Sequence, residues 1–519
     1  MSEAGQADAP GRLPALLVAG REQAGSTGRQ TLVSISERVP ELDLPSILTL
    51  PKRTVAERHG TGVAAHPVIT PRASIDRFYW SRPSDGFAMV ATGATLGLSP
   101  SVTDRFHALA SEWDRLLEDA LVDDPSNGAR GAGPTLLGGF SFDPQLPTSD
   151  RWLGFPPALF TLPHLQLARV DGACWVTSNF LVAPSGRTVP EHDEWVSERE
   201  ALLAAGTVRA PGEAPPSAFG EPVLLEWEDA GDGEAWKALV AQGATAIGEG
   251  RFDKVVLARE VNARSSREVD HAMLIRRLET AYPACAVFAC EVGGALFVGA
   301  SPEQLVGTEG TSVTVASLAG TAPRGVDEVE DREAARGLLA SAKDRREHEV
   351  VRRAVVESLE EDCDRISAAA EPVVLALPNV HHLYTPVTAR LRPGMSPLHV
   401  VRALHPTPAV GGYPRADALA FIREHEQLDR GWYAAPIGWI QRSRSDFAVA
   451  LRSALIRGTE ISLYAGCGVM ADSDPESEFT ETLLKLQAMK LALGGSVDRT
   501  DGDFLQASIG AHSTHGAVR

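Results

Sequence analysis

The chain of 519 residues has 44% hydrophobic and 23% charged residues, a composition typical of globular rather than disordered proteins. Its formal net charge of −19 argues against non-specific binding to nucleic acid or to an anionic membrane surface, because both require a basic face. A small anionic substrate is compatible with this charge, since a few arginines, lysines or metal ions reverse the field locally.

The spacing of the cysteines and the length of the apolar segments indicate in which cellular compartment the protein is expected. Five scattered cysteines follow neither a disulfide framework nor metal-ligand spacing, so we expect a reduced, cytoplasmic protein. The first twenty residues lack the basic and long apolar segments of a signal peptide. Because no run approaches ~18 uninterrupted apolar residues, we expect no membrane span.

In chain order, composition predicts an arm, a large domain with an internal linker, and a tail. Residues 1–50, rich in Gly, Ala, Pro and Ser, are expected to be a poorly ordered arm with one short strand at TLVSISERV. A domain over 51–495 would comprise an N-terminal part (51–203), a linker (204–222) and a motif-rich part (223–495). We expect a flexible tail over 496–519. Strands with interspersed helices predict an α+β fold with large antiparallel sheets.

The motif-rich part contains strand-and-turn segments with chemically interesting residues. FDKVVLARE places Lys254 near the start of a strand, and LFVGASPEQLVG places Glu303 just after one. FAVALRSALI alternates like a strand with Arg452 on one face. LYAGCGVMADSDPE contains Gly466 and Gly468, and glycine in a strand often marks the close approach of a ligand. Taken singly, the lysine and the arginine are explained equally well as solvated strand residues.

The segment DSDPESEFTETLLKLQAMKLAL predicts a helix with Asp474 as its cap and Pro475 in its first turn. At about 100° per residue, Glu478, Glu481 and Lys485 share one stripe, which continues into apolar residues. The acidic stripe therefore points inward. An ordinary solvated i, i+4 pair of Glu481 with Lys485 is the alternative explanation.

A second helix with inward-facing acids is predicted by SAKDRREHEVVRRAVVESLEE. Asp344, Glu347 and His348 lie on its apolar face, although a local pairing of Asp344 with His348 would explain one such helix. Two such helices favour a shared site. Converging carboxylates with open positions suit Mg²⁺, whereas Zn²⁺ prefers more His or Cys ligands than His348 alone provides.

Together and in this order, the motifs resemble the chorismate-utilising enzymes, which include isochorismate synthases, salicylate synthases and the large component of anthranilate synthase. The resemblance is strong over 220–495 and looser over 70–200, and it rests on KVVLAR, GASPE, LAGT, KDRREH, HHL, LHPTPAVGGYPR, RGWYAAPIGW, AGCGV and ESEFTETLLK. It implies one α+β chorismate-binding catalytic domain, with two large antiparallel sheets packed together and helices outside.

The resemblance also implies residue roles. Glu347 and Glu481 would hold Mg²⁺, with Asp344 and Glu478 close by or acting through water, and the ion would neutralise the ring carboxylate of chorismate. The enolpyruvyl carboxylate would be bound by Arg452 and Tyr433, whose planar fork and hydroxyl suit a carboxylate. The remaining substrate contacts would come from Gly320, Thr321, His382, Gly466 and Lys485.

For the conversion of chorismate to isochorismate, the family pattern makes Lys254 the base that activates water at C2 and Glu303 the acid that protonates the departing C4 hydroxyl. Burial should lower the pKa of Lys254 and raise that of Glu303, and such opposite shifts are typical of a tuned acid–base pair.

The residue before Gly320 bears on the choice of reaction. It is Ala319 rather than the nucleophilic lysine of many aminodeoxychorismate synthases, so water or ammonia would attack. Ammonia would imply an anthranilate synthase with a glutaminase partner, but the LLES-type motif of those enzymes is missing from this sequence. LHPTPAVGGYPR and RGWYAAPIGW are more similar to isochorismate synthases than to salicylate synthases.

We therefore expect an isochorismate synthase that needs no glutaminase subunit and is monomeric. Its product would serve menaquinone or siderophore biosynthesis. A salicylate synthase remains the alternative enzyme. A chorismate-binding pseudoenzyme would predict loss of Lys254, Glu303, Glu347 or Glu481, and all four are present. A structural metal-binding protein would leave Lys254, Glu303 and Arg452 unexplained.

Overall fold

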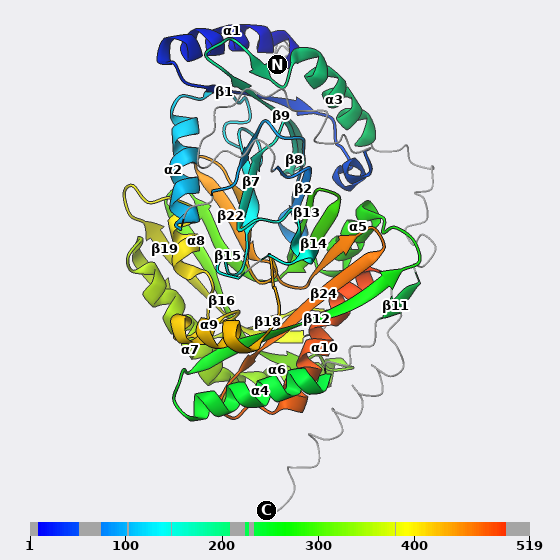
Figure 1. Cartoon of the computed structure of the whole chain (residues 1–519), viewed down its shortest axis with the longest axis vertical. Coiled ribbons are helices and arrows are strands. Elements are labelled where there is room, and N and C mark those ends of the chain that lie inside the picture. The colour runs from blue at the N-terminus through cyan, green and yellow to red at the C-terminus, as the bar shows by residue number, and fades with distance from the viewer. Residues whose placement is uncertain are drawn as a thin grey trace, which may run out of the picture.

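Two large, mostly antiparallel β-sheets form the centre of the molecule, and helices lie outside them (Figure 1). The computed structural model describes residues 9–50, 74–100, 103–146, 148–207, 224–227, 233–378 and 380–494. Within these ranges one sheet has 14 strands and the other has 10. The predicted α+β fold is confirmed.

The larger sheet contains strands from both sides of the predicted linker. In spatial order its strands are β11 (Leu225–Trp227), β12 (Lys254–Ser265), β24 (Glu460–Val469), β23 (Ser453–Arg457), β14 (Ala295–Ser301), β13 (Ala286–Val292), β2 (Arg77–Arg82), β3 (Phe87–Thr92), β8 (Leu165–Val170), β9 (Ala173–Val182), β1 (Thr31–Val39) and β5 (Leu121–Asp123), with β10 (Thr188–Val189) on β9 and β20 (Gly412–Tyr413) on β12. Its pairings are antiparallel except that β1 runs parallel to β5. Because β2 pairs with β13, the two parts of the chain share one sheet.

The smaller sheet has the same mixed origin. Its strands in spatial order are β17 (Cys363–Ala368), β19 (Val380–Leu391), β16 (Ser312–Pro323), β15 (Gln304–Glu309), β22 (Arg444–Val449), β21 (Pro436–Ile440), β6 (Leu136–Phe140), β7 (Ala158–Leu162) and β4 (Leu96–Leu98), with β18 (Val373–Ala376) on β19. The chain passes from the larger to the smaller sheet between β14 and β15, at residues 302–303.

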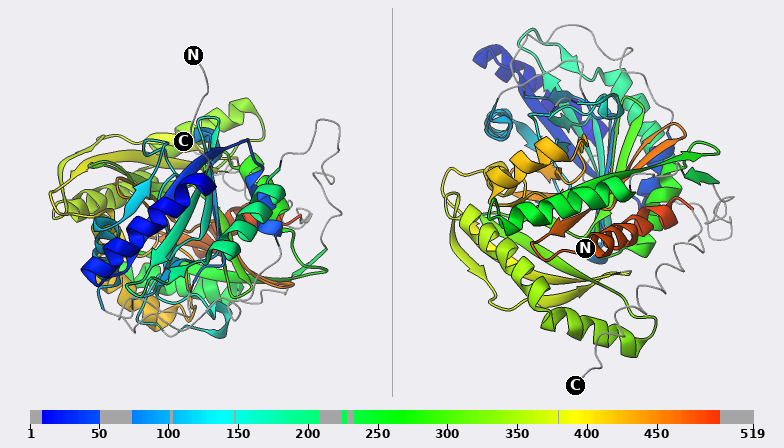
Figure 2. Two further views of the ribbon diagram at one scale, coloured as in Figure 1. Left: turned by 90° about the horizontal axis from the view of Figure 1, so that it is seen from above. Right: turned by 60° about the horizontal axis from the view of Figure 1, so that its bottom comes forward.

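Helices lie at the two ends of the molecule and along its sides (Figure 1). They are α1 (Ala9–Thr27), α2 (Arg105–Glu118), α3 (His192–Ala205), α4 (Gly233–Gly248), α5 (His271–Ala281), α6 (Glu328–Ala340), α7 (Ala342–Leu359), α8 (Pro397–Leu404), α9 (Arg415–His425) and α10 (Pro475–Ala492), with 3₁₀ turns η1 (Leu44–Thr49), η3 (Pro83–Asp85) and η4 (Asp150–Trp152). In Figure 1, α1 and α3 lie at one end, and α4, α6, α7 and α10 lie at the other. In the right-hand view of Figure 2, α4 and α10 run side by side.

The strands of the larger sheet contribute buried apolar side chains on both faces of the sheet. Successive side chains of a strand point to opposite faces. In β2, Phe78 and Trp80 join the apolar layer between the sheets, whereas Tyr79 joins the layer beneath the outer helices. In β13, Phe288 follows the first pattern and Val287 the second.

The predicted poorly ordered arm is wrong for residues 9–50. TLVSISERV forms the expected strand, and this β1 pairs with β9 along its whole length. Helix α1 packs on β1, with Leu13 buried and Gly20 in close contact with the sheet. A Cβ on Gly20 would lie 2.7 Å from Val33 Cγ2, so the small residues that suggested a loose arm permit close helix–sheet packing. The linker falls largely, and the tail entirely, outside the described residues.

Two sequence expectations about the whole molecule can be compared with the structure. Among the described residues, no helix combines the length and apolar character required to cross a bilayer. All five cysteines are free and buried.

Candidate active site

Helix α10 begins and faces inward as its sequence predicts. The side chain of Asp474 accepts a hydrogen bond from the Ser477 backbone N–H (2.9 Å), and Pro475 occupies the first turn. Glu478 is only 3% exposed, and Ala488 and Met489 further along the helix are also buried. The unusual inward orientation of an acidic stripe is therefore real.

Helix α7 presents its acids in the same way. The Ser341 side chain caps it by accepting a hydrogen bond from the Asp344 backbone N–H. His348 is buried and contacts Thr385 Oγ1 through Nε2 (2.9 Å). Burial lowers the pKa of His348 to about 4, so the ring is neutral. The local Asp344–His348 pair considered from the sequence is not formed, because the ring of His348 contacts Thr385 of β19 and the carboxylate of Asp344 accepts a hydrogen bond from Ser341 Oγ.

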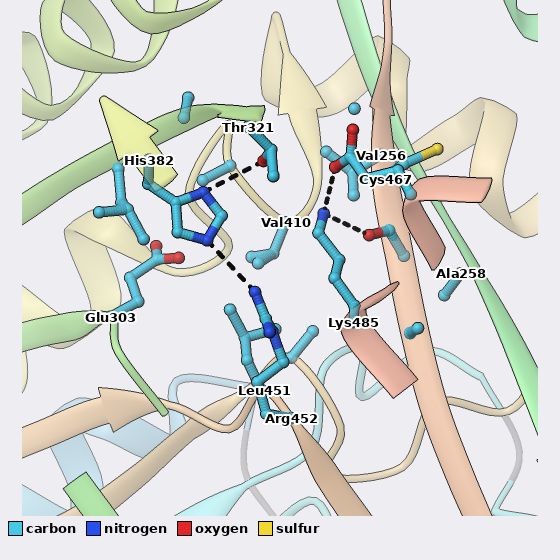
Figure 3. Close-up of a pocket in the computed structure, with 18 of the residues that line it drawn as sticks. Val256, Ala258, Glu303, Thr321, His382, Val410, Leu451, Arg452, Cys467 and Lys485 are labelled. Atoms are coloured by element: carbon cyan, nitrogen blue, oxygen red, sulfur yellow. Dashed lines mark hydrogen bonds and ion pairs between the residues drawn. The ribbon is translucent and has the colours of Figure 1, made fainter. Parts of the chain in front are cut away.

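A pocket lies where β12 and β24 of the larger sheet meet β16 and β19 of the smaller sheet and helices α7 and α10 (Figure 3). It encloses about 740 Å³, part of which is open to solvent. Most of the predicted site residues line it, namely Lys254, Glu303, Gly320, Thr321, Glu347, His382, Tyr433, Arg452, Gly466, Glu481 and Lys485. Asp344 and Glu478 are not among the lining residues.

Lys254 is buried at the start of β12 and forms an ion pair with Glu347 of α7. Its Nζ lies 2.8 Å from Glu347 Oε1, and its side chain is 1% exposed. Burial alone would raise the pKa of Glu347, but the ammonium of Lys254 outweighs burial and lowers it. The pair needs the glycine beside it, because a Cβ on Gly468 would lie 2.4 Å from Glu347 Oε1. The expected lowering of the Lys254 pKa stays a prediction.

A second ion pair lies within α10. Lys485 Nζ is 2.5 Å from Glu481 Oε1 and also donates a hydrogen bond to the backbone oxygen of Gly466 (2.8 Å; Figure 3). This is the i, i+4 pair foreseen from the sequence, but it lines the pocket instead of facing only solvent. Gly466 thus lines the pocket and presents its backbone oxygen to Lys485.

The third carboxylate, Glu478, is held behind the pocket wall. Its Oε1 accepts a hydrogen bond from Ser473 Oγ (2.7 Å) and lies 3.1 Å from Lys343 Nζ of α7. Burial, and then the charge of Glu481, raises the pKa of Glu478. The sequence interpretation missed both Lys343 and Ser473, although each lies within a quoted motif or the segment that opens α10.

The acidic residues suit a divalent cation that also binds a substrate anion. Burial raises the pKa of Asp344, and the neighbouring charges of Glu347 and Glu481 raise it further, so negative charges crowd this region. In the described part of the chain, no three His, Cys, Asp or Glu side chains are placed to hold a metal by themselves. Mg²⁺ commonly uses one or two protein carboxylates together with water and substrate oxygens, so this donor set fits that ion.

Arg452 is oriented by a short chain of hydrogen bonds. Its Nη2 donates to His382 Nε2 (3.2 Å), so the His382 proton is on Nδ1, which lies 3.2 Å from the Gly320 backbone oxygen and 3.1 Å from Thr321 Oγ1. Burial, together with the charges of Arg452 and Lys485, keeps the pKa of His382 well below its usual value, so the ring is neutral. Figure 3 shows this chain crossing the pocket.

The expected strand through Arg452 is wrong. Strand β22 ends at Val449 and β23 begins at Ser453, and Arg452 between them has φ +49°. A non-glycine residue in this left-handed region is strained and commonly marks a functional position. Alternating apolar residues cannot reveal such a break, because they continue on both sides of it.

Glu303 differs from Glu347 in that the pKa of its carboxyl group is raised instead of lowered. It is 3% exposed, and its Oε1 accepts a long hydrogen bond from Thr407 Oγ1 (3.5 Å). Burial raises the pKa of Glu303 to about 7, despite the opposing charge of Lys254. Figure 3 shows Glu303 and His382 on one side of the pocket and Lys485 on the other.

Tyr433 and Arg430 complete the wall. Burial raises the pKa of Tyr433, so its hydroxyl remains protonated and can donate to a carboxylate. Its ring stacks on Tyr464 with centroids 5.3 Å apart. Arg430, which the sequence interpretation missed, is fully paired with Glu426 and donates to the Val256 and Val410 backbone oxygens, so it fixes the wall.

A buried pocket with an amine, a carboxyl group of raised pKa and an oriented arginine is typical of an acid–base enzyme for a small carboxylate substrate. The chain matches the chorismate binding enzyme family over residues 66–494. The salicylate biosynthesis isochorismate synthase of Pseudomonas aeruginosa is 38% identical over 418 residues, which cover 80% of this chain and 84% of that protein. Isochorismate synthase MenF of Bacillus subtilis is 34% identical over 425 residues, which cover 81% and 88%.

A solved structure supports the same fold. MenF, the menaquinone-specific isochorismate synthase of Escherichia coli, aligns with 93% of this chain and 99% of its own, with a TM-score of 0.68 and 23% identity. The chain therefore belongs to the chorismate binding enzyme family, as its motifs predict.

Proposed function

We propose that this chain is an isochorismate synthase, an isomerase that converts chorismate to isochorismate. The observation that carries this proposal is the pair of buried groups, Lys254 and Glu303, which reach one pocket from different elements. The names of the two sequence relatives support the same reaction.

The reaction adds water at C2, shifts the ring double bonds and expels the C4 hydroxyl, so it consumes and releases one water. Lys254 takes a proton from the attacking water at Nζ, and Glu303 donates its carboxyl proton to the departing oxygen. A carboxyl group with a pKa of about 7 retains its proton over much of the neutral range, which is what this acid requires. Lys254 acts as a base only after its ammonium group has lost a proton to solvent, and release of the carboxylate of Glu347 makes that loss easier.

Arg452 and Tyr433 bind the enolpyruvyl carboxylate. The guanidinium is buried and held by His382, so little of its freedom is lost when it binds the substrate. Its planar fork matches a carboxylate, and the protonated Tyr433 hydroxyl provides a further donor. Gly320 and Thr321 line the adjoining wall, where a bulkier chain would crowd Asp344, since a Cβ on Gly320 would lie 3.1 Å from Asp344 Cβ.

Glu347 and Glu481 would hold Mg²⁺, which when bound supplies positive charge for the ring carboxylate of the substrate. Asp344 and Glu478 support these two residues from behind the pocket wall. Their crowded negative charge is the property of this chain that favours the ion.

Several features favour isochorismate over other products. Ala319 lines the pocket and offers no nucleophile, so a covalent intermediate on this residue is excluded. We propose that water, not ammonia, attacks, so that the enzyme needs no glutaminase subunit. We also propose that it works as a monomer. The free buried cysteines are compatible with a reducing cytoplasm.

Analysis of the products tests the proposal. The protein is incubated with chorismate and Mg²⁺, ring products are separated by chromatography, and pyruvate is measured in the same sample. Isochorismate without pyruvate is expected, and Glu303→Gln is the matched control because it retains the shape of the acid. Salicylate with an equal amount of pyruvate would identify a salicylate synthase. Anthranilate formed when ammonium is added would identify an ammonia-using enzyme.

A further inference from the structure

Every glutamate proposed to serve the metal is paired with a lysine of its own. The pairs are Lys254–Glu347 (2.8 Å), Lys343–Glu478 (3.1 Å) and Lys485–Glu481 (2.5 Å). Three positive charges therefore balance three of the four negative charges around the site. A cation that enters this region meets ammonium groups as well as carboxylates.

Lys343 differs from the other two lysines in its exposure and position. Its side chain is 38% exposed, compared with 1% for Lys254 and 17% for Lys485, and it does not line the pocket. In the proposed chemistry, Lys254 is the base and Lys485 contacts the substrate. Lys343 has no access to the substrate from behind the wall, so its role must lie in its contact with Glu478.

The position of Lys343 on its own helix also argues for a role toward the acids. It is the second residue of α7, where the positive end of the helix dipole disfavours a cation. Its Nζ lies 3.1 Å from Oε1 of Glu478 on α10. The ammonium is thus held at an unfavourable helix position by the carboxylates across the gap between α7 and α10.

We propose that Lys343 is a built-in counter-ion that weakens Mg²⁺ binding to the free enzyme by neutralising Glu478. This inference rests on the proposed Mg²⁺ site. Entry of the ion repels the ammonium, and a long, partly exposed lysine can turn into solvent without leaving a buried charge behind. Lys254 and Lys485 cannot leave in this way, because both are largely enclosed by the pocket.

The consequence is that Mg²⁺ binds weakly until the substrate carboxylate joins the site. Without Lys343, the acidic residues would hold the ion tightly even in the absence of substrate.

The test compares Mg²⁺ affinities of the free protein by isothermal titration calorimetry with MgCl₂ alone. Lys343→Gln removes the charge and should bind Mg²⁺ about tenfold more tightly, a change equal to ~1.4 kcal/mol. Lys343→Arg keeps the charge and should resemble the parent. Arg346→Gln is the matched control, because Arg346 lies on the same helix and pairs with exposed Asp472 (3.0 Å) at the approach to α10. It should change the affinity by less than about twofold.

A second measurement separates this role from a structural one. The Mg²⁺ concentration that gives half-maximal turnover should fall in Lys343→Gln but not in Arg346→Gln, and thermal unfolding shows whether each variant is folded. Unchanged or weaker Mg²⁺ binding by folded Lys343→Gln would overturn the counter-ion role, the weaker case indicating a clamp between α7 and α10. If Lys343→Gln does not fold, Lys343→Met is used, with the same expected tightening and the same overturning result. A parent that neither binds Mg²⁺ nor needs it for turnover would overturn the metal site itself.

Discussion

Two buried glutamates in one pocket, Glu303 and Glu347, have pKa values shifted in opposite directions. Burial raises the pKa of Glu303 to about 7, whereas Lys254 lowers that of Glu347 in spite of burial. The main difference is the ion pair of 2.8 Å between Lys254 and Glu347, to which the charges of Lys485 and Lys343 add, whereas at Glu303 burial outweighs the charge of Lys254. The same residue type thus becomes a proton donor at one position in the pocket and an anion at another.

The two ends also differ in their construction. Glu303 lies where the chain leaves the larger sheet for the smaller one, and its backbone oxygen accepts a hydrogen bond from Val449 N–H (3.1 Å). Glu347 lies on a helix whose acids face lysines of β12 and α10. The neutral carboxyl group is therefore held where the chain passes between the sheets, and the proposed metal ligands are held on helices.

The largest effect is expected for Lys254→Ala, which removes the base and leaves Glu347 without its partner. Turnover should fall by about 10³- to 10⁴-fold, at the upper end of what a general base contributes. Steady-state measurement of isochorismate formation checks this, and chorismate binding in the presence of Mg²⁺ should persist.

The control for this variant is Lys237→Ala. Lys237 lies outside the pocket, and its Nζ is 2.8 Å from Oε2 of the exposed Glu476 on α10. It should retain parental turnover. Residual activity of Lys254→Ala within about tenfold of the parent would remove Lys254 from the role of base.

Glu303→Gln tests whether Glu303 is the proton donor, in contrast to the anionic Glu347. It keeps the shape of the side chain but cannot donate the proton, so kcat should fall by about 10²- to 10³-fold. The pH dependence has a definite sign: with its pKa raised to about 7, Glu303 is protonated below that pH and loses its proton above it. The kcat/KM of the parent should therefore decline as pH rises through about 7, and this decline should be missing from the residual activity of Glu303→Gln. A decline that persists unchanged in the variant would show that another group controls it.

Glu481→Gln tests whether the charged end serves a metal. It removes a carboxylate from α10 and leaves Lys485 without its ion-pair partner. The Mg²⁺ concentration for half-maximal turnover should rise by roughly 10- to 100-fold, with weaker chorismate binding. Glu476→Gln on the exposed face of the same helix is the matched control. A Glu481→Gln enzyme that needs no more Mg²⁺ than its parent would contradict the ligand role.

The sequence predicts those features that depend on local periodicity or short motifs. The inward faces of α7 and α10 follow from the 3.6-residue spacing of their apolar residues, and β1 follows from its alternation. Features that depend on partners far along the chain escape such analysis. The order of residues 9–50 comes from pairing with β9, as in the Ser34–Asn179 contact across 145 positions.

In the candidate site, too, some features follow from the sequence and others do not. The motifs predict which residues line the pocket, because the fold brings them together whatever their individual conformations. They do not predict the ion-pair partners of Lys254 and Lys343, or the backbone break at Arg452, because these depend on distances between separate elements and on a single φ angle.

The smallest expected effect is for Gly468→Ala. This variant tests the Lys254–Glu347 ion pair, which makes the pKa of Glu347 differ from that of Glu303. The added methyl would lie 2.4 Å from Glu347 Oε1 and 2.8 Å from Lys254 Cε, so both flexible side chains must move while the strand remains in place. Turnover should fall by about tenfold, because misplacing a reacting group by a fraction of an ångström already costs this much. The melting temperature should change little, and because Glu303 is untouched the decline of kcat/KM near pH 7 should persist. Full activity in this variant would show that the Lys254–Glu347 ion pair tolerates displacement and does not set the geometry of the base.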